Sequence, residues 1–153
     1  MIDFVFENVQ KFKENQVRQV IERSVFVTLK ETKFKKNFYL SVLVTNNIGI
    51  KKINKEYRKI NKFTNVLSFP QNEIRFFNKR QKKIIIGDIV FSLEKILQES
   101  KDQKKSFSDH LSHMTIHGVL HLLGFEHKKH KDFIMMKNKE ILVLSKMEIS
   151  SPY

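Results

Sequence analysis

All six histidines lie between residues 110 and 130, and two of them have the spacing of metal ligands on a helix. His117 and His121 are four residues apart, so on a helix their rings project from one face, about 6 Å apart along the axis. Gly124 is expected to end that helix, and a chain reversal there can return His127 toward the same point. The spacing therefore predicts one divalent ion per chain, bound by His117, His121 and His127.

Three neutral imidazoles leave a fourth zinc position for water, which is the arrangement of catalytic rather than structural sites. Because no ligand is anionic, the ion keeps its full charge and can lower the pKa of bound water to about 7. Zinc is the expected ion, and nickel or another divalent ion fits the same ligands. We expect a metal-activated water and an anionic substrate such as a phosphodiester.

The remaining histidines are not expected to bind the ion directly. His113 lies one turn before His117 on the same face, but it is about 12 Å from His121 along the axis, so these two cannot share one ion. We expect His113 in an outer position around the metal or facing substrate. His110 and His130 are expected to be solvated.

The chain has a strong excess of positive charge, with a net charge of +13 from 29 basic and 16 acidic side chains. Such an excess attracts polyanions, and RNA is the obvious candidate. The basic residues are mostly lysines, which is equally typical of an AT-rich genome, so both interpretations stay open. Few aromatic residues lie in the basic stretches, so we expect little base-specific stacking.

The length of 153 residues favours one domain spanning residues 1–153. The absence of cysteine rules out disulfides, thiolate ligands and a cysteine nucleophile. The amino terminus does not resemble a signal peptide, and no apolar run approaches the roughly 20 residues that span a bilayer. We expect a cytoplasmic protein with no membrane partner.

Apolar periodicity predicts alternating strands and helices, and hence an α/β or α+β sheet protein. The expected strands cover 2–7, 38–45, 66–69 and 84–91, with a loop or mobile edge over 71–83. The expected helices cover 10–30 and about 48–60, and the second of these should direct Ile50, Ile53, Tyr57 and Ile60 inward.

Capping residues mark three further helices. Ser92 is a plausible N-cap for a helix that buries Leu93, Ile96 and Leu97. Residues 106–109 resemble a capping box with Asp109 in place of glutamate, and they should begin the histidine helix, which runs to about residue 123. A last helix, roughly 130–146, should direct Phe133, Met136, Ile141 and Leu144 toward the core.

Residues 117–127, His-Gly-Val-Leu-His-Leu-Leu-Gly-Phe-Glu-His, closely resemble the signature His-Gly-x-Leu-His-Leu-x-Gly-Tyr-Asp-His of the YbeY family. Members of this family are bacterial endoribonucleases that mature ribosomal RNA. The resemblance extends to Tyr57-Arg58, to 64–70 (Thr-Asn-Val-Leu-Ser-Phe-Pro), to 87–89, and to Met136, Glu140 and Leu142. It implies a mixed, mostly parallel four-stranded sheet with about five helices and a metal helix placed as in zinc metallopeptidases.

The same resemblance implies a metal-dependent single-strand endoribonuclease that acts in ribosomal RNA maturation, at the 3′ end of the small-subunit RNA, and in ribosome quality control. Its partners would be ribosomal RNA and the small ribosomal subunit. Asn65 replaces a family aspartate, and either the lost charge weakens catalysis or asparagine preserves a capping role. Phe125 and Glu126 replace tyrosine and aspartate in the family signature.

Several residues outside the histidine cluster are candidates for the site. The guanidinium of Arg58 can hold a phosphate at two points, and the resemblance supports a substrate-binding role for it. Glu126, next to the third proposed ligand, is a candidate outer neighbour of the metal or proton acceptor, or an ordinary solvated turn residue. Asp88 either accepts a hydrogen bond from a metal histidine or binds backbone amides at a bulge. Ser68 is assigned to an outer or substrate-facing position by the resemblance.

Two other functions share part of this pattern. A metallopeptidase of the His-Glu-x-x-His class has the same histidine spacing but needs a glutamate as general base where this chain has Gly118. A non-catalytic ribosome-assembly factor with a bound metal would share the basic charge. Against it, a structural zinc normally has four protein ligands, and cysteine is absent.

Overall fold

The computed structural model describes residues 1–71, 83–126 and 128–153. Its sheet has the strand order β1-β2-β4-β3. The β1–β2 and β2–β4 pairs are parallel, and β3 runs antiparallel to β4. The expectation of a mixed, mostly parallel four-stranded sheet is therefore confirmed, with strands β1 (Ile2–Phe6), β2 (Asn37–Thr45), β3 (Val66–Pro70) and β4 (Lys83–Ser92).

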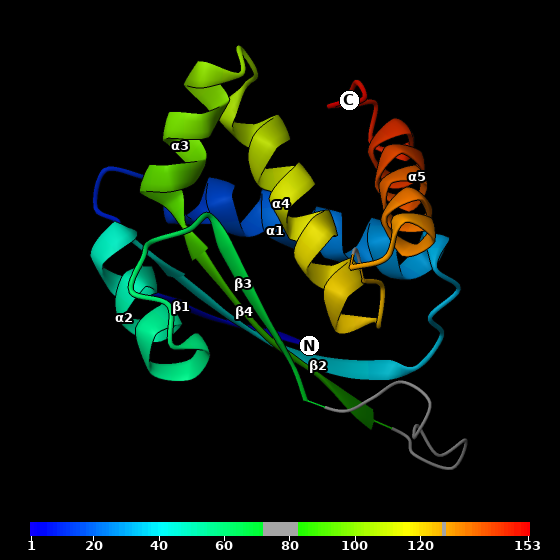
Figure 1. Cartoon of the computed structure of the whole chain (residues 1–153), viewed down its shortest axis with the longest axis horizontal. Helices are drawn as coiled ribbons and strands as arrows, with labels where there is room; N and C mark the ends of the chain where they lie inside the picture. The colour runs from blue at the N-terminus through cyan, green and yellow to red at the C-terminus, as the bar shows by residue number, and fades with distance from the viewer. Residues whose placement is uncertain (72–82, 127) are drawn as a thin grey trace.

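The described part of the chain also contains the five expected helices, and four of them cover one face of the sheet (Figure 1). These four are α1 (Glu14–Glu31), α3 (Leu93–Asp102), α4 (Phe107–Leu122) and α5 (His130–Lys146). The remaining helix, α2 (Asn47–Arg58), lies on the other side of the sheet. Among the described residues, no helix combines the length and apolar character needed to cross a membrane.

Helix α4, which carries His117 and His121, is the central helix of the fold. The Ser106 side chain caps it by accepting a hydrogen bond from the Asp109 amide at 3.0 Å, as the sequence predicted. Gly124 follows the helix with a φ of +94°, which is the left-handed conformation expected where the helix ends. Most side chains of α4 are buried, because the helix packs against the sheet, against α1 and against α5.

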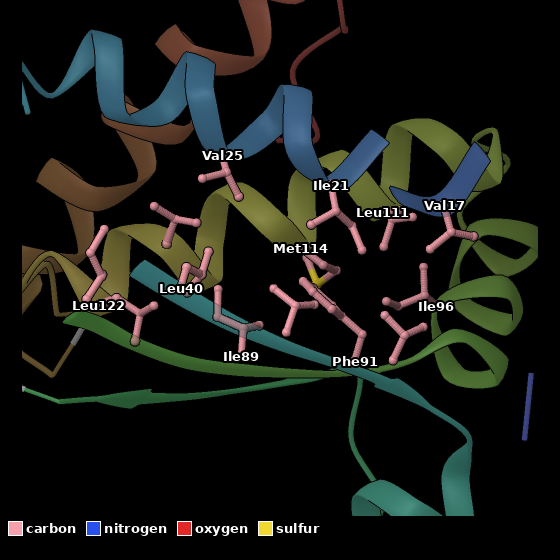
Figure 2. Close-up of a cluster of buried hydrophobic side chains, with 14 of the residues drawn as sticks. Val17, Ile21, Val25, Leu40, Ile89, Phe91, Ile96, Leu111, Met114 and Leu122 are labelled. Carbon is pink, nitrogen blue, oxygen red and sulfur yellow. The ribbon is translucent and has the colours of Figure 1, made fainter. Parts of the chain in front are cut away.

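The main core lies between the sheet and helices α1, α3 and α4 (Figure 2). Apolar side chains from one face of β2 and β4 meet one stripe of each helix, and this contact removes them from water. Residues that show this arrangement include Val17, Ile21, Val25, Leu40, Ile89, Phe91, Ile96, Leu111, Met114 and Leu122. A smaller apolar cluster joins α4 to α5 and holds the two helices together.

Gly87 allows β3 and β4 to approach closely, beside a register shift between β2 and β4 at Tyr39 and Leu40. Its φ is +147°, and a Cβ at this position would lie 2.3 Å from the carbonyl oxygen of Phe69. Only glycine fits such a conformation and such a distance without movement of the backbone. Gly87 therefore permits the close approach of β3 to β4 beside this register shift.

The predicted inward face of α2 is partly wrong. Ile50 is fully buried, but Tyr57 is 65% exposed and Ile60 is half exposed. The helix ends at Arg58, and Lys59 adopts a left-handed conformation with φ of +60°, so helical periodicity no longer applies at Ile60. Tyr57 lies at the edge of the sheet, where its ring contacts Phe69 at a centroid distance of 5.8 Å.

The predicted core face of α5 also needs correction. Met136 and Leu144 are buried as expected, whereas Phe133 is 43% exposed and Ile141 is only half-buried. The buried stripe instead includes Glu140 and Val143, because the helix turns its Met136–Glu140 side toward α4. Helix α1 begins at Glu14 rather than near residue 10. The predicted loop over 71–83 lies almost wholly outside the described residues.

Candidate active site

His117 and His121 project from the same side of α4 and face one another. Their Nε2 atoms are 3.1 Å apart, and both side chains are half-buried. The predicted shared face of the two residues is therefore present in the fold. His117 keeps its other ring nitrogen, Nδ1, 2.5 Å from the Oε1 atom of Glu140 on α5.

Both histidines line a cavity of about 520 Å³ between α4 and β3. Arg58, Ser68 and Glu126 also line it, so the fold brings together five residues that the sequence analysis assigned to one site. The other lining residues are Thr64, Asn65, Val66, Leu67, Pro70, Phe125 and Lys128. Because it is open to solvent and lined by both polar and apolar groups, the cavity has the character of a binding site for a polar ligand.

Glu140 connects the histidines of α4 to the segment after α5. Only 1% of it is exposed, and its carboxylate accepts hydrogen bonds from His113 Nε2 at 3.0 Å, His117 Nδ1 at 2.5 Å and the Tyr153 hydroxyl at 2.6 Å. Three donors satisfy a carboxylate that burial would otherwise strongly destabilise. The carboxylate therefore fixes the ring orientation and the tautomer of His117.

These contacts change two pKa values. Burial alone would raise the pKa of Glu140, but the hydrogen bonds from its three partners outweigh burial and lower that pKa to about 2. Burial, followed by the hydrogen bond to Glu140, raises the pKa of Tyr153 well above its ordinary value. Glu140 is thus an anion and Tyr153 a neutral donor at neutral pH.

The paired histidines fit the geometry of a divalent metal ligand pair. With Zn–N distances of 2.0–2.1 Å and tetrahedral angles, two ligand nitrogens should be about 3.3 Å apart. The observed separation of 3.1 Å is close to this value. Glu140 accepts the Nδ1 proton of His117, so the lone pair of Nε2 faces His121, as in metal sites where a carboxylate orients the histidine.

The third predicted ligand, His127, lies outside the described residues. Within residues 1–71, 83–126 and 128–153, no set of three His, Cys, Asp or Glu residues is arranged to hold a metal. His117 and His121 therefore have the spacing of two ligands, and metal binding by His117, His121 and His127 stays a prediction.

Arg58 is held at the mouth of the cavity by β3. Its guanidinium donates a hydrogen bond to the Ser68 carbonyl at 2.6 Å and lies 5.0 Å from the centroid of the Phe69 ring. The side chain is exposed, so these two contacts orient it without removing it from solvent. The Ser68 hydroxyl donates a hydrogen bond to the Gly118 carbonyl at 3.2 Å, which connects β3 to the histidine helix.

Two predicted residues lie away from the cavity. Asp88 is not among the described residues that line it. Its neighbour Ile89 packs beside Gly118 of α4, so strand alternation directs Asp88 to the opposite face of the sheet. His113 is buried against Glu140 and is not among the described residues that line the cavity, so its connection to His117 runs through Glu140.

The expectation that His110 is solvated is wrong, whereas His130 is exposed as expected. His110 is buried with its Nε2 atom 3.1 Å from Glu99 Oε1. Burial lowers the pKa of His110 against the opposing effect of Glu99. No sequence pattern places Glu99 of α3 beside His110 of α4, because that contact depends on how the two helices pack.

Comparison with known proteins decides the family. The model of the family described as Endoribonuclease YbeY matches residues 4–148. The Endoribonuclease YbeY of Bartonella bacilliformis is 35% identical over 153 residues, which cover 99% of this chain and 96% of that protein. The chain belongs to the YbeY family.

A solved relative supports the fold. The solution structure of TM1509 from Thermotoga maritima matches with a TM-score of 0.61 and 21% identity, over 97% of this chain and 92% of that one. The family model and the Bartonella protein confirm the expected resemblance to the YbeY family over nearly the whole chain. The family description places the YbeY proteins among the nucleases, hydrolases that cut within an RNA chain.

Asn65, which replaces an aspartate of the YbeY motif, makes one hydrogen bond to its neighbour in the chain and one to α3. Its carbonyl oxygen accepts from the Val66 amide at 2.7 Å, and its amide nitrogen donates to Glu99 Oε1 at 2.9 Å. An aspartate could make the first bond, but it would place two carboxylates together at the second. Asparagine is therefore matched to Glu99 in this chain, and its carbonyl oxygen accepts from the first amide of β3.

Sequence reasoning assigned no role in the site to Glu140 or Tyr153. One signal for Glu140 was present, since a charged residue stood among apolar positions at helical spacing on α5. A charge on such a stripe is buried only when partners satisfy it. Tyr153 offered no comparable signal, because it follows α5 without any periodic pattern.

Proposed function

We propose that this chain is a metal-dependent endoribonuclease that cuts single-stranded RNA, with one divalent ion, zinc in the simplest case, held by His117, His121 and His127. The observation that carries the proposal is the 3.1 Å approach of two histidine Nε2 atoms in the wall of a cavity that Arg58 also lines. Membership of the YbeY family supports RNA as the substrate.

The residues of the cavity have separate parts in the proposed reaction. A divalent ion held at the histidines would supply Lewis acidity and lower the pKa of water. Glu140 holds a proton at Nδ1 of His117 and so keeps Nε2 available as a lone pair. Glu126, an exposed carboxylate in the cavity wall, is the candidate acceptor for the proton that the attacking water loses.

Arg58 is proposed to hold the phosphate of the RNA. Its contacts with the Ser68 carbonyl and the Phe69 ring leave further N–H donors for a phosphate. Two parallel N–H···O bonds would neutralise charge on the phosphate and fix its orientation in the cavity. The fit of a planar fork to two phosphate oxygens is what a lysine lacks.

A metallopeptidase is less well supported by the local packing. The general base of that class would occupy position 118, where this chain has glycine. A Cβ at Gly118 would already lie 3.1 Å from the Ser68 hydroxyl oxygen, so β3 occupies the space into which a longer side chain would extend. The nuclease proposal does not require a side chain at this position.

Arg58→Lys tests the substrate contact. We expect the purified variant to fold and bind metal like the wild type, yet to cut a single-stranded RNA about ten- to hundredfold more slowly, because a point charge cannot make the paired hydrogen bonds. Cleavage by the wild type should stop when a chelator is added. Lys59→Arg, which changes the adjacent exposed residue, is the matched control and should cut normally. Unchanged cleavage by Arg58→Lys would reject the phosphate-binding role.

Within the cell, we propose that the substrate is precursor ribosomal RNA, cut near the 3′ end of the small-subunit RNA, and that the chain takes part in ribosome quality control. The resemblance to the family supports this assignment, and the net charge of +13 supports only binding to an anionic polymer. Selectivity would then come from the small ribosomal subunit as partner.

Depletion of the protein in its own cell, followed by mapping of ribosomal RNA ends, tests the substrate. We expect small-subunit RNA with extended 3′ ends to accumulate, and re-expression of the wild type should restore the mature ends. Re-expression of Arg58→Lys should restore them only in part. Normal ends after depletion would show that the substrate lies elsewhere.

A further inference from the structure

A second hollow lies where α1 meets the segment that leads into β2, and its lining combines aromatic rings with lysines. We call this hollow, of about 320 Å³, the α1–β2 groove. Its lining residues are Phe26, Leu29, Lys30, Lys33, Phe34, Lys35, Lys36 and Phe38. No acidic residue is among them, so the groove presents only positive charge beside apolar surface.

The aromatic rings of the groove are arranged around Phe38 at its base. The Phe26 and Phe38 centroids are 5.8 Å apart, and those of Phe34 and Phe38 are 6.4 Å apart, both with edge contacts. Phe38 is buried, but Phe26 is 54% exposed although it is a large apolar side chain. An exposed ring held in place by a buried one is a platform on which a planar group can stack.

The lysines surround these rings. Lys30, Lys33 and Lys35 are exposed, and Lys33 is held in a left-handed turn with φ of +57° that directs the chain back toward β2. Basic side chains around aromatic platforms are the arrangement by which proteins bind single-stranded nucleic acid without base-specific hydrogen bonds. Few such platforms were expected from the sequence. Phe26 lies on α1, and only the fold brings it beside the lysines that follow this helix.

Shared lining residues link the groove to the candidate active site. Lys33 and Phe34 also line a neighbouring hollow of about 380 Å³, together with Phe125 and Lys139. Phe125 in turn lines the cavity that contains His117 and His121. Figure 1 shows the end of α1 and its connection to β2 on the same side of the molecule as the end of α4 and the start of α5. Among the described residues that line these hollows, two are acidic: Glu31 in the intermediate hollow and Glu126 in the histidine cavity.

We propose that the α1–β2 groove binds single-stranded RNA that extends from the candidate active site across Phe125 and Phe34. This proposal rests on the proposed nuclease function, and it adds a binding surface distant from the reacting bond. Bases stack on Phe26 and Phe34, while the lysines contact phosphates on either side. RNA long enough to reach the groove is therefore bound more tightly than RNA that fills only the histidine cavity.

The test compares two single-stranded RNAs, of about 5 and about 20 nucleotides, so that only the longer one spans several stacking positions. Binding to the metal-loaded protein is measured by stopped-flow anisotropy before cleavage, and cleavage of both RNAs is followed in parallel. Lys30→Glu with Lys35→Glu should weaken binding of the longer RNA about tenfold and leave the shorter one unchanged. The slope of log K against log salt should fall by about 0.7 for each lysine.

Two further variants separate stacking from charge. Phe26→Ala should weaken binding of the longer RNA about tenfold, whereas Phe26→Tyr keeps a ring and should bind like the wild type. Lys51→Glu with Lys52→Glu is the matched control, since it changes the net charge equally at exposed positions on α2. Binding of the longer RNA should be unchanged in this control.

The outcomes distinguish a failure of the groove proposal from a failure of the proposed nuclease function. If the groove variants bind the longer RNA like the wild type, or if the α2 control weakens binding equally, the groove proposal is overturned even when the wild type cuts RNA. Preserved RNA binding in the lysine variants would leave an acidic protein as the alternative occupant. If the wild type cuts neither RNA but the groove variants still lose binding, the nuclease function fails and RNA binding by the groove stands.

Discussion

Purified His117→Ala and His121→Ala should each contain little or no divalent metal and should not cut RNA. With only two of three proposed ligands left, affinity should fall by more than the roughly 10- to 100-fold caused by loss of a ligand's hydrogen-bond partner. The measurement is elemental analysis of the purified proteins, together with RNA cleavage before and after metal is added back. Chelator-treated wild type should behave like the two variants.

Matched histidine variants show whether the effect is specific. His130→Ala makes the same chemical change at an exposed position, so metal content and cleavage should match those of the wild type. His113→Ala should also retain the ion, since this residue contacts Glu140 rather than the cavity. His127→Ala tests the third proposed ligand directly. Full metal retention in both His117→Ala and His121→Ala would contradict the proposed site.

Replacement of Glu140 should have the next largest effect, on both stability and metal affinity. Glu140→Ala removes a buried carboxylate that accepts three hydrogen bonds and leaves their donors without it, so we expect a loss of about 2 to 4 kcal/mol in the free energy of unfolding. The measurement is denaturant unfolding of the metal-free proteins. Glu7→Ala removes an exposed carboxylate and should change stability little.

Glu140→Gln separates orientation of His117 from simple folding. The side chain keeps its size, but it loses its charge and exchanges an acceptor for a donor. We expect a folded protein whose metal affinity, measured by competition with a chelator, is about 10- to 100-fold lower. Tyr153→Phe removes one of the three hydrogen bonds, and its effect should be much smaller. Wild-type metal affinity in a folded Glu140→Gln protein would show that Glu140 does not position the ligand.

The residues changed in these two sets of variants differ in how far their roles could be predicted from the sequence. His117 and His121 could be paired from spacing alone, because residues four apart on a helix always share a face. The helix itself could be located from Ser106, Asp109 and Gly124, whose effects on the backbone are local. The mixed, mostly parallel character of the sheet came from the resemblance to a known family rather than from any single pattern, and the strand order came from the structure.

Side-chain partners across elements required the tertiary structure. Glu140 meets His117 only because α5 packs against α4 with its Met136–Glu140 side inward, a choice that apolar periodicity alone did not fix. The burial of His110 similarly depends on Glu99 of α3. Such contacts join residues far apart in the chain, and their geometry is set by packing of whole helices rather than by local propensity.

The sequence alone thus determined the strands, the helices and the facing histidine pair, because hydrogen bonding and side-chain direction within one element depend on near neighbours. The tertiary structure decided which groups surround that pair, with Arg58 held by β3 and Glu140 behind His117. It also decided which predicted residue does not, since Asp88 lies on the opposite face of the sheet. It also brought Phe26 beside the lysines that follow α1. These arrangements arise where separate elements pack together to bury apolar surface, and no spacing along the chain encodes them directly.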